Sequence, residues 1–327
     1  MSDVRYIPIS RLDESVMLPL MEEEARMWMM DFSWDYSAIQ QVLLSFIREK
    51  MLPGYAALTN DNRMVGYTYF LANQARGSIG ALYTTPATPP EKAQKIADDL
   101  LELAIVCFQD SSDINRIEAQ ILPFHGQDYS RVFAKYGFSH YPRHYLVRNI
   151  NADDAEKEPF EPVKIIPWDS SLIGHAATMT ALSYRDHLDH QILEDYLTQS
   201  SCENYLRGLV TNPGCGVFLP EASFMCLDGH YNPCGYVICS RISDGCALIP
   251  QIAMHPGWQG RGLGAALINR CLRQLQSMNF NRLSLVVTEK NSRASELYRR
   301  MGFQLCREFG AFTWNRDPGN DEYPDIS

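Results

Sequence analysis

The stretch Gln259-Gly260-Arg261-Gly262-Leu263-Gly264 lies between an apolar run, residues 248–254, and an amphipathic run, residues 265–278. This order predicts a strand that passes through a glycine-rich turn into a helix. Several backbone N–H groups and the positive helix end then point toward one place, which favours an anion. A glycine-rich hexamer alone is a weak signal, so its meaning depends on the sequence around it.

Composition and length describe an ordinary globular protein. The chain has 327 residues, of which 46% are hydrophobic and 21% charged, so two domains are expected. Residues 1–11 lack the basic and apolar regions of a signal peptide, and no apolar run approaches the roughly 18 residues of a membrane helix. Nine cysteines without zinc-ligand spacing indicate reduced, buried thiols. We therefore expect a cytoplasmic protein without a membrane segment.

Charge is unevenly distributed along the chain. The formal net charge of −10 disfavours nucleic acid as a partner. Residues 1–162 hold 15 basic and 23 acidic side chains, whereas residues 163–327 hold 14 and 16. A basic segment surrounds the glycine-rich hexamer and contains Arg261, Arg270, Arg273, Arg282, Lys290, Arg293, Arg299, Arg300 and Arg307. Most of these side chains are expected on solvated helix faces, and the remainder offer a place for phosphate groups.

The two halves of the sequence resemble each other. Residues 151–162 are charged, contain proline and read as an exposed linker. On either side, three short segments recur in the same order: residues 4–8 and 163–167, residues 65–67 and 234–236, and residues 133–138 and 298–303. This pattern predicts two copies of one domain, over residues 1–150 and 163–327.

The second copy has a readable order of elements. Helical spacing covers residues 171–184, 189–209 and 262–278, and strands are predicted at residues 222–227, 235–242, 246–254, 282–288, 303–307 and 311–314. Asn291 is expected to cap a helix that runs to about residue 301, with Gly302 as its left-handed end. The predicted fold class is α+β, a mixed sheet flanked by helices.

Two motifs in this half resemble the GNAT superfamily of N-acetyltransferases, which use acetyl-CoA. The first, Q/R-x-x-G-x-G/A after a strand, matches Gln259, Gly262 and Gly264. The second, N-x-x-A-x-x-L-Y-x-x-x-G-F, matches Asn291, Ala294, Leu297, Tyr298, Gly302 and Phe303. The resemblance covers residues 163–315 well and residues 4–148 weakly. It implies two tandem GNAT-like domains, an arrangement similar to that of mycothiol synthase, whose substrate is not implied.

The resemblance implies that acetyl-CoA binds at the glycine turn. Glycines let a pyrophosphate approach backbone N–H groups, and residues 252–254 resemble a splayed strand whose N–H polarises the thioester carbonyl. The alternatives are a plain tight turn, a core strand, an Arg261 that faces water and an Asn291 that only caps its helix. The expected cofactor-binding residues are Ile252, Ala253, Met254, Gln259, Gly260, Arg261, Gly262, Leu263, Gly264, Ala265 and Asn291.

Tyr298 is the predicted catalytic residue. By resemblance its hydroxyl protonates the departing CoA thiolate, a role that suits a phenol with an ordinary pKa of about 10. The alternative is an aromatic ring that only packs in the core.

The attacking amine must be neutral, so a proton acceptor is needed. The strand position where relatives often place a glutamate reads Pro250-Gln251, and neither residue is a base. The loop between the first two helices, where relatives gather substrate, offers Asp186, His187 and His190. His187 and His190 also have HxxH spacing, but without a third ligand no metal is expected. For Asp186 and Asp189 the expected role is to cap the next helix, and a role as base is the alternative.

The first copy departs from both motifs. Prolines at 89 and 90, which lack N–H donors, stand in the segment that replaces the glycine turn, and Phe133 stands in the place of Tyr298. We therefore expect a degenerate domain that does not bind CoA. It would form an internal pseudo-dimer with the second copy or shape the acceptor pocket.

These observations together predict an N-acetyltransferase. It would move acetyl from acetyl-CoA to a primary amine of a small molecule or protein by direct attack in a ternary complex. The alternatives are a non-catalytic acyl-CoA sensor and an acyltransferase that uses a longer acyl-CoA. The sequence predicts no nucleic-acid or membrane partner, and a monomer or a homodimer fits it equally well.

Overall fold

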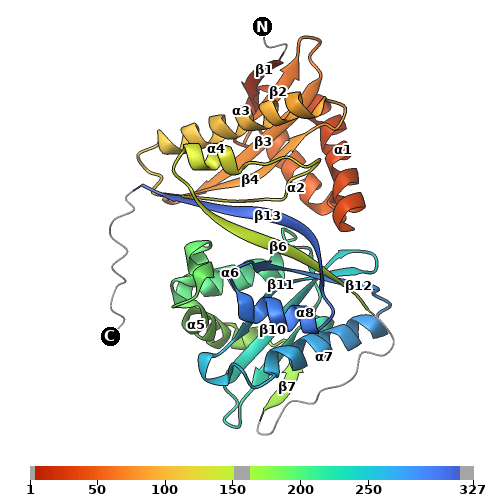
Figure 1. Cartoon of the computed structure of the whole chain (residues 1–327), viewed down its shortest axis with the longest axis vertical. Coiled ribbons are helices and arrows are strands. Elements are labelled where there is room, and N and C mark those ends of the chain that lie inside the picture. Colours follow the sequence, from red (N-terminus) through yellow and green to blue (C-terminus); the bar gives the residue numbers. More distant parts are fainter. Residues whose placement is uncertain (1–3, 151–162, 317–327) are drawn as a thin grey trace. The chain divides into compact units, whose positions relative to one another are not determined.

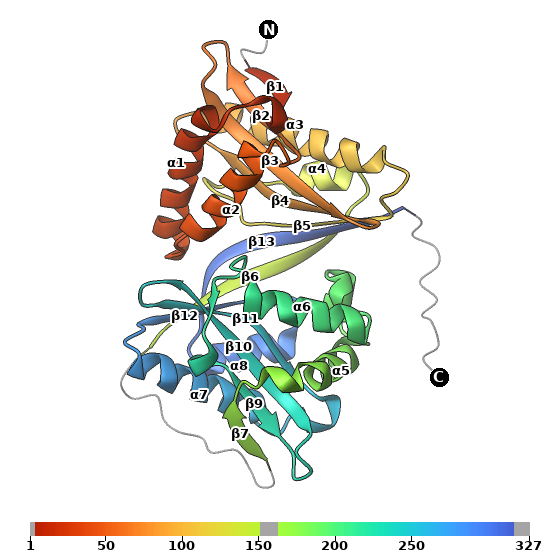
Figure 2. The same ribbon diagram turned by 180° about the vertical axis from the view of Figure 1, so that it is seen from behind.

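The computed structural model describes residues 4–150 and 163–316, so the expected linker at residues 151–162 lies outside the described residues. The chain forms two compact units (Figures 1 and 2). Unit 1 consists of Met1–Met27, Gln40–Tyr141 and Phe309–Ser327, and unit 2 of Trp28–Ile39 and Pro142–Glu308.

Unit 1 is built on a mixed sheet with the strand order β1-β2-β3-β4-β5-β13. Its neighbours are antiparallel except β4 and β5, which are parallel and are joined through α3. Its strands are β1 Val4–Pro8, β2 Gly54–Thr59, β3 Met64–Asn73, β4 Arg76–Thr84 and β5 Arg116–Ile121. Its helices are α1 Glu14–Phe32, α2 Ser37–Arg48, α3 Pro90–Gln109 and α4 Ser130–Lys135.

Unit 2 repeats this arrangement with the strand order β7-β9-β10-β11-β12-β6, and β8 pairs with β10. Its parallel pair, β11 and β12, is joined through α7. The strands are β7 Lys164–Pro167, β8 Val217–Phe218, β9 Phe224–Leu227, β10 Pro233–Ser243, β11 Cys246–Met254, β12 Arg282–Thr288 and β6 Ser139–Asn149. The helices are α5 Ile173–Tyr184, α6 Gln199–Thr211, α7 Leu263–Ser277 and α8 Ser292–Arg300. The mixed sheet and the internal repeat are thus confirmed.

The sheet of unit 2 is covered on both faces, as Figures 1 and 2 show. Alternate residues of a strand point to opposite faces, so Val237 of β10 joins the apolar cluster under α7 and α8, whereas Tyr236 joins the one under α5 and α6. This double coverage holds the central strands rigidly from either side.

Two strands pair in the unit to which the sequence did not assign them. Gly310–Asn315 of β13 (Gln304–Asn315) pair with β5 in unit 1, although they end the second half of the sequence. Arg143–Asn149 of β6 pair with β12 in unit 2, although they end the first half. The compact units therefore differ from the expected division into residues 1–150 and 163–327. The two expected strands at residues 303–307 and 311–314 are one continuous strand.

Because β13 pairs with β5, we expect that replacing a buried residue of β13 destabilises unit 1. Phe312 is 3% exposed and its ring stacks on Phe133 at 4.0 Å between centroids. Phe312→Ala is expected to lower the free energy of unfolding by about 3–5 kcal/mol. Urea denaturation measures the loss, and hydrogen exchange should place it in Gln40–Tyr141. Leu305→Ala, in the same strand but 52% exposed, should change stability by no more than about 0.5 kcal/mol. Equal effects of the two substitutions would contradict the assignment of Phe312 to this core.

Smaller differences concern α6 and the thiols. The helix expected over residues 189–209 is interrupted by 3-10 turns at Leu188–Gln191 and Glu194–Tyr196. The helix proper begins only after Thr198, whose hydroxyl accepts from the Ser201 N–H at 3.1 Å, because this capping box stops it from extending backward.

All nine cysteines are free, but Cys107 and Cys306 are exposed rather than buried. Within the described residues, no helix is long and apolar enough to cross a membrane.

Candidate functional site

The two central strands of unit 2 separate partway along their length. β11 and β12 pair only at Cys246–Ile249 with Arg282–Leu285. Beyond this point β11 stays paired with β10 as far as Met254, and β12 stays paired with β6 as far as Thr288. Pro250, which has no N–H, stands where the separation begins. The result is an open wedge with one edge of the β11 backbone along it.

That edge carries available N–H groups. The carbonyl of Ile252 accepts from the Tyr184 hydroxyl at 3.5 Å, and the carbonyl of Met254 accepts from Ser183 Oγ at 2.8 Å and from Gln259 Nε2 at 3.2 Å. These carbonyls therefore point away from β10. The N–H and C=O of one strand residue point to the same side, so the N–H groups of Ile252 and Met254 also face the wedge.

The glycine turn connects the end of β11 to the start of α7. Gly260 and Gly262 have φ angles of 78° and 82°, the left-handed region that only glycine adopts without strain. Gly262 is the N-cap of α7. The N–H groups of Leu263, Gly264 and Ala265 in the first turn have no intrahelical acceptor. They are free to bind an anion.

One cavity of about 980 Å³ unites the wedge, the glycine turn, the start of α7 and one face of α8. Its volume is in the range of cofactor sites. Each predicted cofactor-binding residue lines it, as do Tyr298 and His187, whereas Asp186 and His190 do not. The basic residues that line it are Arg148, Arg261, Arg293 and Arg300, and its lining contains no aspartate or glutamate. The cavity therefore suits a ligand with several negative charges.

The arginines are held in different ways. Arg293 donates through Nη1 to Gln259 Oε1 at 2.8 Å, and its Nη2 would lie 3.2 Å from a Cβ placed on Gly260. Arg261 stacks on the Trp258 ring, 4.7 Å from its centroid, rather than simply facing water. Burial lowers the pKa of Arg148, which belongs to β6 and so comes from the first half of the sequence. Nothing local in the sequence marks Arg148 as a site residue, because its strand joins a sheet that is distant in sequence.

Most of the basic segment serves other purposes. Arg299 and Arg300 pair with Glu296, and Arg307 pairs with Asp31 at 2.9 Å. Arg282 donates to Ser33 Oγ at 2.7 Å. Only Arg261, Arg293 and Arg300 of that segment reach the cavity.

Tyr298 combines a buried ring with an available hydroxyl. The residue is 6% exposed and its ring packs edge-on against Phe303. Burial raises the pKa of Tyr298, and the negative charge of Asp189 raises it further. The phenol is therefore protonated at neutral pH. Among the described residues no side chain or backbone group pairs with this hydroxyl, so core packing and a role in the cavity are compatible.

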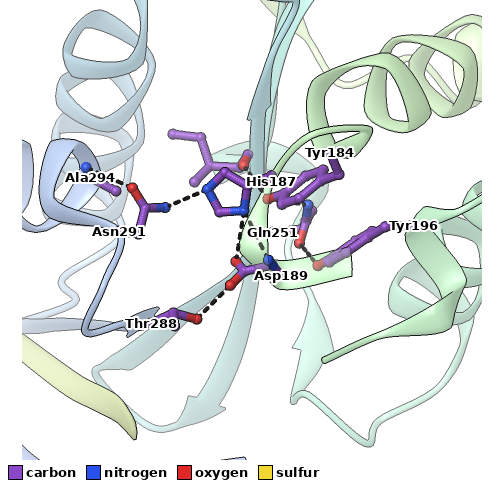
Figure 3. Close-up of polar contacts among 9 residues, drawn as sticks. Tyr184, His187, Asp189, Tyr196, Gln251, Thr288, Asn291 and Ala294 are labelled. Carbon is purple, nitrogen blue, oxygen red and sulfur yellow. Dashed lines mark hydrogen bonds and ion pairs between the residues drawn. The ribbon is translucent and has the colours of Figure 1, made fainter. Parts of the chain in front are cut away.

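The loop after α5 brings His187 to the cavity (Figure 3). Its Nδ1 lies 3.1 Å from the Asp189 N–H and its Nε2 lies 3.0 Å from Asn291 Nδ2. Asn291 Oδ1 accepts from the Ala294 N–H at 3.1 Å, so Asn291 caps α8 as predicted. His187, rather than Asp186 or Asp189, caps the 3-10 turn that follows, because its Nδ1 can reach the free N–H. Asp186 is exposed to solvent.

Asp189 and Gln251 have roles that the sequence did not reveal. The Asp189 carboxylate accepts from Thr288 Oγ1 at 2.5 Å (Figure 3). Gln251, which is 4% exposed, donates to the Tyr184 hydroxyl at 3.1 Å and accepts from the Tyr196 hydroxyl at 2.8 Å. Both contacts join residues far apart in sequence. Gln251 therefore belongs to a buried network and does not point a polar group at the cavity.

A metal has no obvious place here. Within residues 4–150 and 163–316, no three His, Cys, Asp or Glu side chains form a group that could hold a metal ion. His187 and His190 thus lack a third ligand among these residues.

Comparison with known proteins shows what this site is similar to. Residues 185–303 match the acetyltransferase (GNAT) family. A mycothiol acetyltransferase of Beutenbergia cavernae is 44% identical over 52 residues, which cover 16% of this chain and 18% of that protein. One of Thermobifida fusca is 33% identical over 97 residues, 27% of this chain and 30% of that protein. The chain therefore matches less than a third of the length of either relative.

Solved structures resemble the whole chain. A GCN5-related N-acetyltransferase of Sphaerobacter thermophilus aligns over 98% of both chains with 14% identity and a TM-score of 0.67. A tandem GNAT protein from the clavulanic acid biosynthesis pathway aligns over 97% of this chain and all of its own, with 11% identity and a TM-score of 0.61. At such identities the likeness is one of fold, and it is the fold of two tandem GNAT-like domains.

Proposed function

Because residues 185–303 match the acetyltransferase (GNAT) family, we propose that this protein transfers acetyl from acetyl-CoA to a primary amine. The observation that carries the proposal is the single cavity that joins a splayed strand, a glycine turn and Tyr298. An anionic cofactor with a long extended arm requires these three features side by side. The acceptor is the amine of a small molecule or of a protein.

The residues fit acetyl-CoA from one end to the other. N–H groups at Leu263, Gly264 and Ala265 would hold the pyrophosphate, with the positive end of α7 behind them. Four arginines around the cavity would neutralise the remaining phosphate charge. The exposed edge of β11 would pair with the pantetheine arm in the wedge, as one more strand would.

The reaction proceeds by direct attack in a ternary complex. The N–H of Ile252 or Met254 donates to the thioester oxygen, where negative charge grows as the amine nitrogen attacks. The Tyr298 hydroxyl gives its proton to the sulfur as the C–S bond breaks. Its raised pKa means that the hydroxyl still carries this proton when the C–S bond begins to break.

We propose that unit 1 binds no acetyl-CoA. Its helix α3 begins at Pro90 after Pro89, so its first turn offers fewer N–H donors than that of α7. Phe133, in the place that Tyr298 takes in unit 2, is completely buried and has no proton to give. One cofactor per chain is expected.

Calorimetry and a thiol-release assay test the proposal. Titration with acetyl-CoA should give one site per chain, and a panel of primary amines should include an acceptor that releases CoA thiol. Binding without thiol release from any amine would identify an acyl-CoA sensor instead. A second acetyl-CoA site would contradict the assignment of unit 1, and a preference for longer acyl chains would change the donor.

A further inference from the structure

Two arginines beside the glycine turn have no carboxylate partner. Arg261 and Arg293 both line the cavity, and in the part of the chain that the structure describes neither forms an ion pair. Arg299 and Arg307 of the same basic segment are instead paired with acidic side chains. Positive charges gathered at one turn repel one another, and an anion bound among them relieves that repulsion. Arg261 and Arg293 therefore carry charge that a ligand in the cavity can use.

Gln259 holds Arg293 at the turn. Its Oε1 accepts from Arg293 Nη1 at 2.8 Å, and its Nε2 donates to the carbonyl of Met254 at 3.2 Å. Both ends of the amide are engaged, so a guanidinium of α8 is tied to the end of β11. Gly260 leaves room for this arrangement, because a Cβ there would lie 3.2 Å from Arg293 Nη2. A guanidinium has five N–H donors and Gln259 takes one, which leaves the others for a ligand.

Trp258 holds Arg261 by a different contact. The guanidinium carbon of Arg261 lies over the Trp258 ring, 4.7 Å from its centroid. The ring is itself fixed, because it is partly buried and packs against the apolar cluster under α7 and α8. Such a contact uses the face of the guanidinium and leaves the N–H groups at its edge available.

These contacts restrict two side chains that would otherwise be mobile. Arg261 and Arg293 are exposed, and an exposed arginine loses rotamer entropy when a ligand fixes it. Trp258 and Gln259 restrict the same rotamers through contacts within the chain, so less entropy remains to be lost on binding. Neither Trp258 nor Gln259 carries a charge, so their contribution to anion binding depends on the arginine that each one holds.

We propose, as an extension of the acetyl-CoA binding proposed above, that Arg261 and Arg293 together bind the pyrophosphate of the cofactor and that Trp258 and Gln259 are their positioning residues. One guanidinium comes from the turn itself and the other from the first turn of α8. The N–H groups at the start of α7 donate to the same phosphates, and charge-assisted bonds from the arginines strengthen this site. Gln259 thus acts through its side chain as well as through the backbone of the turn.

Binding of CoA and 3′-dephospho-CoA, which both carry the pyrophosphate, tests the role of Arg293. Calorimetry should show that Arg293→Gln raises the Kd about 10- to 100-fold, by the same factor for both ligands. Arg299→Gln is the control, because it removes the same charge from the same helix at a residue that does not line the cavity. Its Kd should change less than about twofold.

Three results would overturn the role of Arg293. They are an unchanged Kd in Arg293→Gln, an equal loss in Arg299→Gln, and a loss with CoA alone, which would place Arg293 at the 3′-phosphate. A wild-type protein that binds neither ligand would instead disprove the proposed function. The two failures are therefore distinguishable.

A double-mutant cycle tests the role of Gln259, which is exposed, so its removal opens no core. Gln259→Ala should raise the Kd for CoA about 3- to 10-fold in the wild type and have no further effect in Arg293→Gln. The KM for acetyl-CoA should rise in parallel, with kcat unchanged. If Gln259→Ala weakens binding equally in both backgrounds, Gln259 acts through Met254 and not through Arg293.

The same cycle applies to Trp258 and Arg261. Trp258→Leu keeps an apolar side chain against the core and removes the ring, so it should raise the Kd for CoA in the wild type but not in Arg261→Gln. Thermal unfolding shows whether Trp258→Leu is folded, and Arg261→Gln, at an exposed position, tests the arginine if it is not. An unchanged Kd in Arg261→Gln, or equal effects of Trp258→Leu in both backgrounds, would remove this pair from the site.

Discussion

Replacement of Tyr298 by phenylalanine is expected to lower kcat about 10²- to 10⁴-fold while the Kd for acetyl-CoA hardly changes. The substitution keeps the ring, which packs against Phe303, and removes only the hydroxyl. Because no group among the described residues pairs with that hydroxyl, stability should change little. Steady-state thiol release and calorimetry with acetyl-CoA together separate the rate from the affinity.

Tyr236→Phe is a matched control in the same unit. Tyr236 is fully buried, does not line the cavity, and its hydroxyl forms a 2.8 Å hydrogen bond with Thr180. Its loss should cost about 0.5–1.5 kcal/mol of stability and leave kcat intact. A Tyr298→Phe enzyme as fast as the wild type would show that another group, or water, protonates the leaving thiolate.

The pKa of Tyr298 gives this prediction a pH dependence. Burial and the charge of Asp189 both raise that pKa, so the acid form persists above the ordinary tyrosine value of about 10. Loss of the Tyr298 proton should therefore not limit kcat at any pH below that value. Asp189→Asn removes the negative charge that helps to raise this pKa. In that variant the fall of kcat at high pH should therefore begin at a lower pH than in the wild type. If kcat falls at the same high pH in Asp189→Asn as in the wild type, the charge of Asp189 does not raise the pKa of Tyr298.

Local rules explain which features the sequence predicted. The turn at the glycine-rich hexamer, the left-handed Gly302 and the Asn291 cap each depend on the conformation of a few neighbouring residues, which residue type largely decides. β11 and β12 were likewise predicted with their observed bounds, because each is a short apolar run closed by turn residues.

Long-range pairing explains what the sequence did not predict. Residues 143–149 end the first copy, yet they complete the sheet of unit 2, and no local signal tells a strand which neighbour it will have. Arg148 reaches the cavity for this reason. The contact between Asp189 and Thr288 spans 99 positions, so the sequence suggested only a helix cap for Asp189. A side-chain contact between residues so far apart in sequence can be identified only from the folded structure.

Gly262→Ala is expected to raise the Kd for acetyl-CoA at least about tenfold. A residue with a Cβ costs roughly 1–2 kcal/mol in the left-handed region, where Gly262 has a φ of 82°. The turn should relax away from that conformation, which tilts the N–H groups of Leu263 and Gly264 away from the phosphates. Each 1.4 kcal/mol lost corresponds to about a tenfold weaker affinity. Calorimetry measures the Kd, and KM for acetyl-CoA should rise with little change in kcat.

The neighbouring Gly257 separates this effect from a general disturbance of the loop. Gly257 has no left-handed φ, does not line the cavity, and an added Cβ would meet only the His255 ring at 3.4 Å. Gly257→Ala should therefore bind acetyl-CoA like the wild type. If Gly262→Ala binds as tightly as Gly257→Ala, the phosphates do not lie at this turn. Arg148 of β6 and Arg300 of α8, which also line the cavity, would then be the place to seek them, because their charge does not depend on the turn.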